Sequence, residues 1–200
     1  MAKPNVISRQ ALLESAKQRI VTYGLDKLTL KGVADGAGVT QGTVYYHFRT
    51  KEQLLLAIVK DLCESSWNQV QDSTASDHRK LQAALAGAKE RCTADSFYHR
   101  LFFSLLAYSF QNEQTKEQLH ALLQFENQAL SEQLASLWPA PPIEGVSSEI
   151  WGILLNALID GLAVQALLSD SFPVDDVYAG LERLLTHWTQ TYRETEEESS

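Results

Sequence analysis

The residues with the most evident chemistry lie between Thr40 and Lys51, in the segment TQGTVYYHFRTK. Thr40 can cap a helix with its side-chain oxygen, and Val44 and Phe48, four positions apart, then face the interior. The side chains left to face outward are those of Gln41, Thr43, Tyr45, Tyr46 and His47. Gln and Thr can bond to base edges in a major groove, whereas Tyr and His can reach phosphates. The segment therefore predicts a short helix that contacts nucleic acid.

A second helix is predicted directly after this segment. Thr50 is followed three residues later by Gln53, which is the pattern of a capping box. Lys51 then stands in the first turn, beside backbone N–H groups that favour an anion. We expect Lys51 to contact a phosphate.

Three short helices are predicted to position these residues, at about 9–23, 30–36 and 41–47. Gly24 is suited to end the first helix, Thr29 can cap the second, and residues 37–39, Ala-Gly-Val, form a tight turn before the third. Two helices joined by a short glycine-containing turn match the helix-turn-helix plan, in which the second helix enters the major groove. The same pattern also occurs as an ordinary corner between two helices in helical proteins.

The distribution of charge supports the nucleic-acid interpretation. The chain has a formal net charge of -8, but residues 1–60 hold nine Lys or Arg and four Asp or Glu. That segment therefore carries +5 and the remainder -13. Such asymmetry indicates a basic module joined to an acidic body, which would repel DNA and help to orient the basic face.

Residues 51–193 are expected to form a second, all-α domain. Apolar residues recur at helical spacing over about 50–70, 79–93, 96–111, 114–138, 146–169 and 174–193. Residues 1–50 would form the DNA-binding domain, and residues 194–200, ETEEESS, a disordered acidic tail. Together these predictions describe an all-α protein of nine helices.

The segment AGVTQGTVYYHFRTKEQLL, within residues 8–60, resembles the DNA-binding domain of the TetR family of bacterial transcriptional regulators. The resemblance implies a homodimer whose first three helices bind an operator, with a C-terminal domain for ligand binding and dimerisation. It places Gln41, Gly42 and Thr43 nearest the base edges and Tyr45 close to bases or backbone. It gives backbone contacts to Tyr46, His47 and Lys51, and a phosphate and a possible groove contact to Thr29 and Lys31. Thr40, the predicted cap, is counted among the DNA-binding residues.

Two glycines, Gly32 and Gly36, occupy the second helix where the family usually has better helix formers. Each weakens a helix by about 0.5–1 kcal/mol relative to alanine. We therefore expect packing to hold this helix.

The aromatic helix at 97–110 has two interpretations, a packed core or one wall of a hydrophobic effector cavity of the kind this family places among its middle helices. Small-molecule sites are mostly apolar with a few polar groups. The candidate walls are Phe102, Phe103, Leu106, Phe125, Trp151 and Leu155, and the candidate polar groups are His99, Tyr108, Asn156 and Asp160. Because few basic residues fall in this region, an apolar, neutral or cationic effector is favoured. The alternative is regulation by a protein partner with no small-molecule effector.

The last two helices carry apolar stripes that predict a four-helix dimer interface. The residues assigned to it are Leu154, Ala157, Leu158, Gly161, Leu162, Gln165, Leu181, Leu184, Leu185 and Trp188. Burial within one subunit is the alternative for part of each stripe.

Other functional classes find no support in the sequence. The five histidines show no metal spacing, and there is no glycine-rich phosphate loop or nucleophile elbow, so no cofactor, metal or catalytic residue is predicted. Cys63 and Cys92 are expected to be buried thiols in a reducing cytoplasm. We expect no secretory signal and no apolar run of the roughly 20 residues that a membrane span needs.

Overall fold

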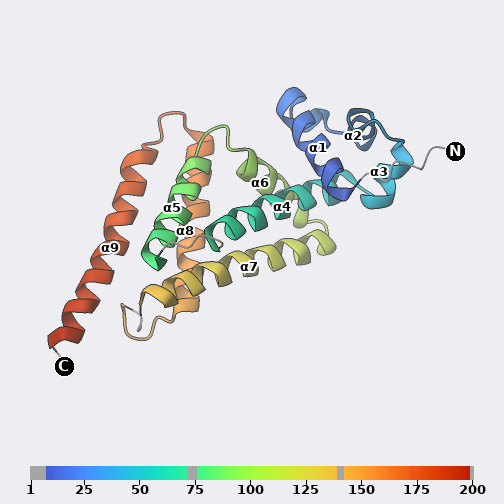
Figure 1. Ribbon diagram of the computed structural model, residues 1–200. Coiled ribbons are helices and arrows are strands. Elements are labelled where there is room, and N and C mark those ends of the chain that lie inside the picture. Colours follow the sequence, from blue (N-terminus) through green and yellow to red (C-terminus); the bar gives the residue numbers. More distant parts are fainter. Residues whose placement is uncertain (1–7, 72–75, 139–141, 199–200) are drawn as a thin grey trace. The chain divides into compact units, whose positions relative to one another are not determined.

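The structure is a computed structural model that describes residues 8–71, 76–138 and 142–198, with backbone only at 77–78 and from 188 onward (Figure 1). Over these residues the regular structure is entirely helical, which confirms the predicted all-α class. The elements are α1 (Arg9–Tyr23), a 3₁₀ turn η1 (Leu25–Lys27), α2 (Leu30–Ala37), α3 (Gln41–His47), α4 (Lys51–Gln71), α5 (Asp77–Arg91), α6 (Phe97–Ser109), α7 (Glu113–Leu137), α8 (Ser148–Leu168) and α9 (Val174–Glu198).

The last helix is longer than the sequence led us to expect. α9 continues to Glu198, through five residues assigned to a disordered tail from residue 194. The residues Arg193 to Glu198 are mostly arginine and glutamate, which are good helix formers. Residues 199–200 lie outside the part of the chain that the structure describes.

The chain divides into two compact units. The first combines residues 1–62 with residues 101–119, and the second combines residues 63–100 with residues 120–200. Because α4 is continuous from Lys51 to Gln71, it contributes to both units. The predicted boundary at residue 50 coincides instead with the start of α4.

Local signals in the sequence fix the ends of α1 and α2 in the first unit. Ser8 caps α1 through its hydroxyl, which accepts from the Ala11 N–H at 3.2 Å. Gly24 ends α1 with a φ of 87°, and its N–H donates to the Ile20 carbonyl. Thr29 caps α2 by accepting from the Gly32 N–H at 3.0 Å. The core that joins α1, α2 and α3 consists of side chains that are each 0% exposed: Leu12, Leu13, Ala16, Val33 and Val44.

The two glycines of α2 face α1 at close range. A Cβ atom at Gly32 would lie 2.7 Å from Nε of Arg19, and one at Gly36 would lie 2.8 Å from Oγ of Ser15. The Ser15 hydroxyl also donates to the Val33 carbonyl at 3.0 Å. Close packing therefore explains why α2 has glycine at positions where alanine would favour the isolated helix.

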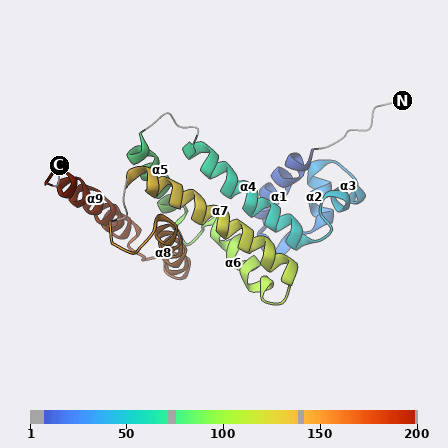
Figure 2. The same cartoon turned by 90° about the horizontal axis from the view of Figure 1, so that it is seen from below.

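The second unit is built around an aliphatic and aromatic core. One buried cluster unites Leu81 and Leu85 of α5, Leu130 and Leu134 of α7, Trp138, Leu155 of α8, and Leu181 and Leu185 of α9. α5 packs alongside α9 (Figure 1), and α7 and α8 appear in the second view (Figure 2). Both cysteines, Cys63 and Cys92, are buried free thiols, as predicted.

Helix α8 is long and apolar enough to cross a membrane, judged by length and composition alone, although the sequence led us to expect no such segment. A core helix of a soluble protein can meet the same criterion. α8 also carries Asn156, Asp160 and Gln165, polar side chains that are costly in a bilayer.

Candidate DNA interface and effector cavity

The turn between α2 and α3 requires a glycine. Gly38 adopts the left-handed conformation, with φ of 67° and ψ of 32°, and its N–H donates to the carbonyls of Ala34 and Asp35. The Val39 N–H donates to the Ala34 carbonyl at 3.0 Å. This pattern closes the end of α2 and directs the chain into α3 within three residues.

The predicted anchors of α3 are buried. Val44 is 0% exposed and Phe48 is 2% exposed. The guanidinium of Arg9 lies over the Phe48 ring, 5.2 Å from its centroid. These contacts fix the rotation of α3, so that Gln41, Tyr45 and Tyr46 face solvent, whereas Thr43 and His47 are partly buried.

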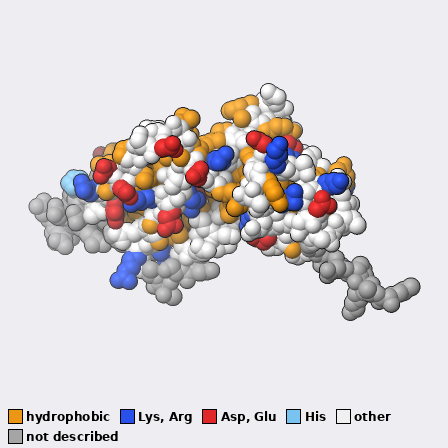
Figure 3. All heavy atoms as spheres, turned by 90° about the horizontal axis from the view of Figure 1, so that it is seen from above, with side chains coloured by type: hydrophobic (Ala, Val, Ile, Leu, Met, Phe, Trp, Pro, Cys, Tyr) orange, Lys and Arg blue, Asp and Glu red, His pale blue; other side chains and the backbone are white. Residues whose placement is uncertain are grey.

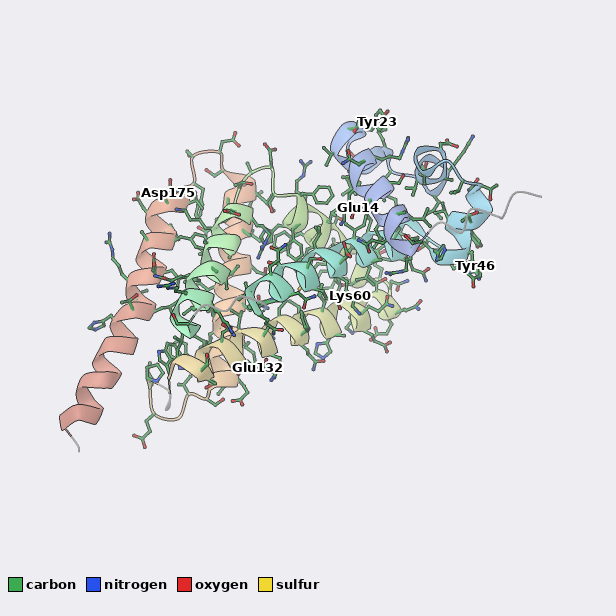
Figure 4. The ribbon with its side chains drawn as sticks, viewed as in Figure 1. Glu14, Tyr23, Tyr46, Lys60, Glu132 and Asp175 are labelled. Atoms are coloured by element: carbon green, nitrogen blue, oxygen red, sulfur yellow. The ribbon has the colours of Figure 1, made fainter. Side chains whose placement is uncertain are left out.

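The outward face of α3 is polar and aromatic. Gln41, Gly42 and Tyr45 are exposed, and Tyr46, at 75% exposure, projects away from the helix (Figure 4). Tyr46 meets the ring of His47 edge to face at 5.2 Å between centroids. A tyrosine hydroxyl and an imidazole held side by side on a surface helix can each donate a hydrogen bond to a phosphate.

Two of the threonines assigned to DNA contact also cap the N-termini of their helices. The Thr40 hydroxyl accepts from the Thr43 N–H at 3.3 Å and lies 3.1 Å from the Thr43 hydroxyl. Thr29 caps α2 in the same way, and Lys31 in the first turn of that helix is exposed. A hydroxyl has one proton and two lone pairs, so these caps leave capacity for a further bond.

Lys51 has a partner that the sequence did not reveal. Its Nζ donates to the Leu25 carbonyl at 2.9 Å, which ties the start of α4 to η1. The first half of the predicted capping box at α4 is present, since the Gln53 N–H donates to Thr50 Oγ1 at 3.1 Å. Gln53 Oε1 accepts from the N–H of Arg49 at 2.9 Å, one residue before the cap, where a capping box would have that of Thr50. An ammonium group has three donors, so the bond to Leu25 leaves two for a phosphate.

Arg49 is a further candidate that the sequence reasoning missed. It is exposed, directly after α3, and its guanidinium lies over the Tyr45 ring at 5.2 Å from the centroid. The available signal was a basic residue directly after the aromatic segment at 45–48. The stacking holds this charge beside the face that presents Tyr46.

The second unit contains a small cavity of about 40 Å³. It is lined by Trp67, Ala84, Leu85, Ala88, Arg91, Tyr98, His99, Glu126, Leu130, Asn156, Ile159 and Asp160. A larger hollow of about 310 Å³ lies between α5 and α9 and contains none of the predicted ligand residues.

Three of the predicted ligand residues, His99, Asn156 and Asp160, line the small cavity, and the other seven do not. Leu155 is instead part of the buried core, with Trp151 packed against it. Phe102 is buried in the first unit, where its ring contacts that of Phe103, and Leu106 is partly buried there.

Two further members of the predicted set reach solvent. Tyr108 and Phe125 are 41% and 39% exposed. Tyr108 belongs to the last turn of α6 and bonds to Asn112, whose amide donates to the tyrosine hydroxyl at 3.4 Å. The C-terminal end of α6 is therefore partly exposed to solvent.

Glu126 is the most consequential cavity residue that the sequence reasoning missed. Its Oε1 accepts from the Tyr98 hydroxyl at 2.9 Å and from Sγ of Cys63 at 3.3 Å. Burial raises the pKa of Glu126, although these two hydrogen bonds oppose the shift. The signal was its register, four residues after Leu122 and four before Leu130 on the inward face of α7.

The predicted dimerisation residues separate into two groups. Leu162, Leu181 and Leu185 are buried within the single chain and belong to its core, so they are not surface groups. Leu154, Leu158 and Leu184 are 51%, 45% and 52% exposed, and Ala157, Gly161 and Gln165 are also exposed. The side chain of Trp188 lies outside the described residues.

Comparison with known proteins finds a family model that matches the N-terminal module. Residues 12–58, which span the module built by α1 to α4, match the family model for bacterial regulatory proteins of the tetR family. This part of the chain is similar to regulators of the TetR family, and the match covers the residues that form the candidate DNA interface.

The TetR-family relatives include a repressor and a regulator of similar length. The chain is 32% identical over 76 residues to the HTH-type transcriptional repressor KstR2 of Mycolicibacterium smegmatis, an alignment of 36% of this chain and only 37% of that protein. It is 28% identical over 174 residues to the HTH-type transcriptional regulator BetI of Escherichia coli, covering 84% of this chain and 86% of the relative.

A solved structure shares the whole TetR-family fold. A putative TetR-family transcriptional regulator from a Rhodococcus species superposes with a TM-score of 0.69 at 19% identity, over 90% of this chain and 97% of that one. At this identity the likeness shows the fold.

Proposed function

We propose that this chain is a transcriptional repressor that binds a palindromic operator as a homodimer and is released by a mainly hydrophobic small molecule. The observation that carries the proposal is the outward face of α3, where Gln41, Gly42, Tyr45 and Tyr46 are exposed on a helix anchored by Val44 and Phe48. Such a helix fits a major groove, with base contacts from its N-terminal residues and backbone contacts from its later ones.

The dimer is supported by the exposed stripe of α8. Ile150, Ile153, Leu154, Leu158 and Val164 are each 39–51% exposed, and Leu168 is 83% exposed. A row of exposed aliphatic side chains along one face of one helix indicates a protein interface. Two copies would present two α3 helices to half-sites one helical turn, or a multiple of it, apart.

Helix α4 offers a physical connection for effector release. It supplies Lys51 to the DNA-binding unit, and Trp67 to the cavity of the second unit. A ligand can shift the DNA affinity only by its differential affinity for the two states. A cavity that reaches one end of this continuous helix supports such coupling.

The test begins with selection of binding sites from random DNA by the purified protein. A palindromic consensus with the stated spacing is expected. Dissociation constants are then measured across a salt series for the wild type, Tyr46→Ala, Lys51→Ala and the control Lys116→Ala, which changes an exposed lysine of α7. The first two variants should bind more weakly, and loss of Lys51 should lower the salt slope by about one unit per half-site. Wild-type binding by both variants at every salt concentration would show that the proposed docking is wrong.

A further inference from the structure

Two polar contacts tie α4 to the preceding helices, one at each end of a single face of α4. The residues of this face follow one another at helical spacing: Lys51, Leu54, Ile58 and Asp61. Lys51 donates to the Leu25 carbonyl of η1 at 2.9 Å, and Asp61 accepts from Nζ of Lys17 in α1 at 2.7 Å. The two middle residues are each 0% exposed. Buried apolar side chains therefore hold the middle of the face, and a charged side chain holds each end.

The contact at Asp61 belongs to a cluster of four side chains. Nζ of Lys17 also donates to Oε1 of Glu14, one turn earlier in α1 (Figure 4), at 2.7 Å. Nε2 of Gln10 donates to Oδ2 of Asp61 and to Oε1 of Glu14, at 3.4 Å in both cases. The side chains of Lys17 and Asp61 are 18% and 21% exposed, so water screens their attraction less than that of a pair in open solvent.

Lys17 remains charged in this cluster. Burial lowers the pKa of Lys17, but its hydrogen bonds to Asp61 and Glu14 outweigh that effect and raise the pKa above its ordinary value. The contact between α1 and α4 is therefore an ion pair at neutral pH.

The ion pair lies next to the point where α4 passes from one compact unit to the other. The first unit includes residues up to Leu62, and the second begins at Cys63. Asp61 follows Lys51 by ten residues, so the two polar contacts are about 15 Å apart along the helix. A restraint at the end of a lever resists tilting more strongly than one at its middle. The ion pair is thus placed to restrain the direction in which α4 leaves the first unit.

We infer that Lys17 and Asp61 are positioning residues for operator binding, because their ion pair fixes the direction of α4 relative to α1 and so sets the half-site spacing that a dimer accepts. Neither residue belongs to the outward face of α3 or to the predicted DNA contacts. The two α3 helices of a dimer must reach both half-sites of a palindrome together. If α1 to α3 can tilt on α4, that freedom is lost on binding, and other spacings become tolerable. This inference rests on the homodimer and palindromic operator of the proposed function.

Net charge alone predicts a different pattern of effects. Loss of Lys17 removes a positive charge from the basic N-terminal segment and would weaken its attraction to DNA, whereas loss of Asp61 removes a negative charge and would strengthen it. A pair that positions α4 predicts that either loss weakens binding. The signs of the two effects therefore separate the two explanations.

The experiment measures dissociation constants of the full-length protein for two DNA duplexes: the palindrome selected from random DNA, and the same palindrome with one base pair inserted between its half-sites. The insertion rotates one half-site by roughly 35° about the DNA axis, since a helical turn takes about 10–10.5 base pairs, and the wild type should bind the longer duplex roughly tenfold more weakly. The variants are Lys17→Met, Asp61→Asn, and a reversed pair that combines Lys17→Asp with Asp61→Lys.

Lys17→Met and Asp61→Asn should each weaken binding to the selected palindrome and reduce the preference between the duplexes by roughly threefold, the range expected for a partly exposed ion pair. The reversed pair keeps the net charge and the summed length of the two side chains, so it should restore the wild-type preference. Lys27→Met and Asp26→Asn, which change exposed residues of η1, are the matched controls. Each should change the affinity for both duplexes by the same factor and leave the preference unchanged.

Several results would overturn the inference. Weaker binding by Lys17→Met together with tighter binding by Asp61→Asn would mean that net charge explains both effects. An equal loss of affinity for both duplexes would mean that the pair only stabilises the fold. A reversed pair that does not recover the preference would show that attraction between the two charges does not position α4.

Two further measurements keep the test decisive. Circular dichroism establishes that each variant is folded, and either single loss must reduce the preference, so one unstable variant leaves the other to decide. Failure of the proposed function is seen separately, as a wild type that selects no palindromic site, and the inference then fails with it. Variants that keep the full preference of a wild type that does select one overturn the inference alone.

Discussion

Asp160 is a carboxyl group in surroundings that favour its neutral form. The titratable and charged groups facing it are His99 and Tyr98 from α6, Glu126 from α7 and Arg91 from α5. Burial is the main reason that its pKa is raised from 3.8 to about 7, with a contribution from the Glu126 charge. In the unfolded chain the group ionises at its ordinary pKa, so ionisation opposes folding as the pH rises from 3.8 to 7.

Asp160→Asn is therefore expected to stabilise the protein in a pH-dependent way. The gain in free energy of unfolding over the wild type should increase between pH 5.5 and 7, by at most about 1.4 kcal/mol per pH unit. Above pH 7 both states of the wild type are ionised, so the gain should level off. Urea unfolding at pH 5.5, 6.5, 7.5 and 8.5 measures it. Glu132→Gln, at an exposed position, should show no such trend, and a constant difference for Asp160→Asn would contradict the expectation.

At the scale of residues, the sequence predicted what depends on neighbours along the chain. The caps at Ser8, Thr29 and Thr40 follow from residue type and spacing, and all three form. The partner of Lys51, the Leu25 carbonyl, lies 26 positions away. A contact that depends on the packing of distant helices leaves no local signal, so the sequence showed the charge of Lys51 without its bond.

Helices α7 and α8 pack so closely at one point that only glycine fits there. In α8, a Cβ atom at Gly152 would lie 2.6 Å from the backbone oxygen of Asn127 and 3.0 Å from the backbone nitrogen of Ser131. These are atoms of α7, so the two helices meet almost backbone to backbone. In α9, by contrast, a Cβ atom at Gly180 would meet nothing within 4 Å.

Gly152→Ala and Gly180→Ala should consequently have opposite effects. Overpacking against a rigid backbone costs about 1–3 kcal/mol, so Gly152→Ala should lower the free energy of unfolding despite its better helix propensity. Gly180→Ala should raise it by roughly 0.5–1 kcal/mol. Denaturant titration of both variants under one condition measures the contrast. If the two alanines shift stability in the same direction, the close approach of α7 and α8 is wrong.

Helix positions were predictable to within a few residues because hydrophobic period and terminal signals are local properties. The direction that each face takes was harder to predict. The apolar positions of α8 form two stripes, one buried, including Leu155, Leu162 and Ala166, and one exposed, including Leu154 and Leu158. The sequence showed that α8 is apolar on two sides. Which of these sides is buried within the chain depends on how the other helices pack against it.

Charge is distributed unevenly over the whole molecule. Residues 1–60 carry +5 and the remainder -13. Acidic and basic side chains are interspersed with hydrophobic ones on the face shown in Figure 3. A basic module on an acidic chain concentrates the attraction for DNA at the N-terminal unit. A dimer would combine two such modules.

The exposed stripe of α8 allows that combination to be tested directly. A glutamate at Leu158, which is 45% exposed, would place a charge within a dimer interface but in solvent on a monomer. Leu158→Glu should therefore shift the mass measured by light scattering from a dimer to the 22.3 kDa of a single chain, and weaken operator binding at least tenfold. Val21→Glu, at a 73% exposed position of α1, is the matched control and should remain dimeric. If the Leu158→Glu and Leu154→Glu variants both remain dimeric, the dimer interface does not include this face of α8. A buried, unpaired carboxylate at either position would strongly destabilise an apolar interface.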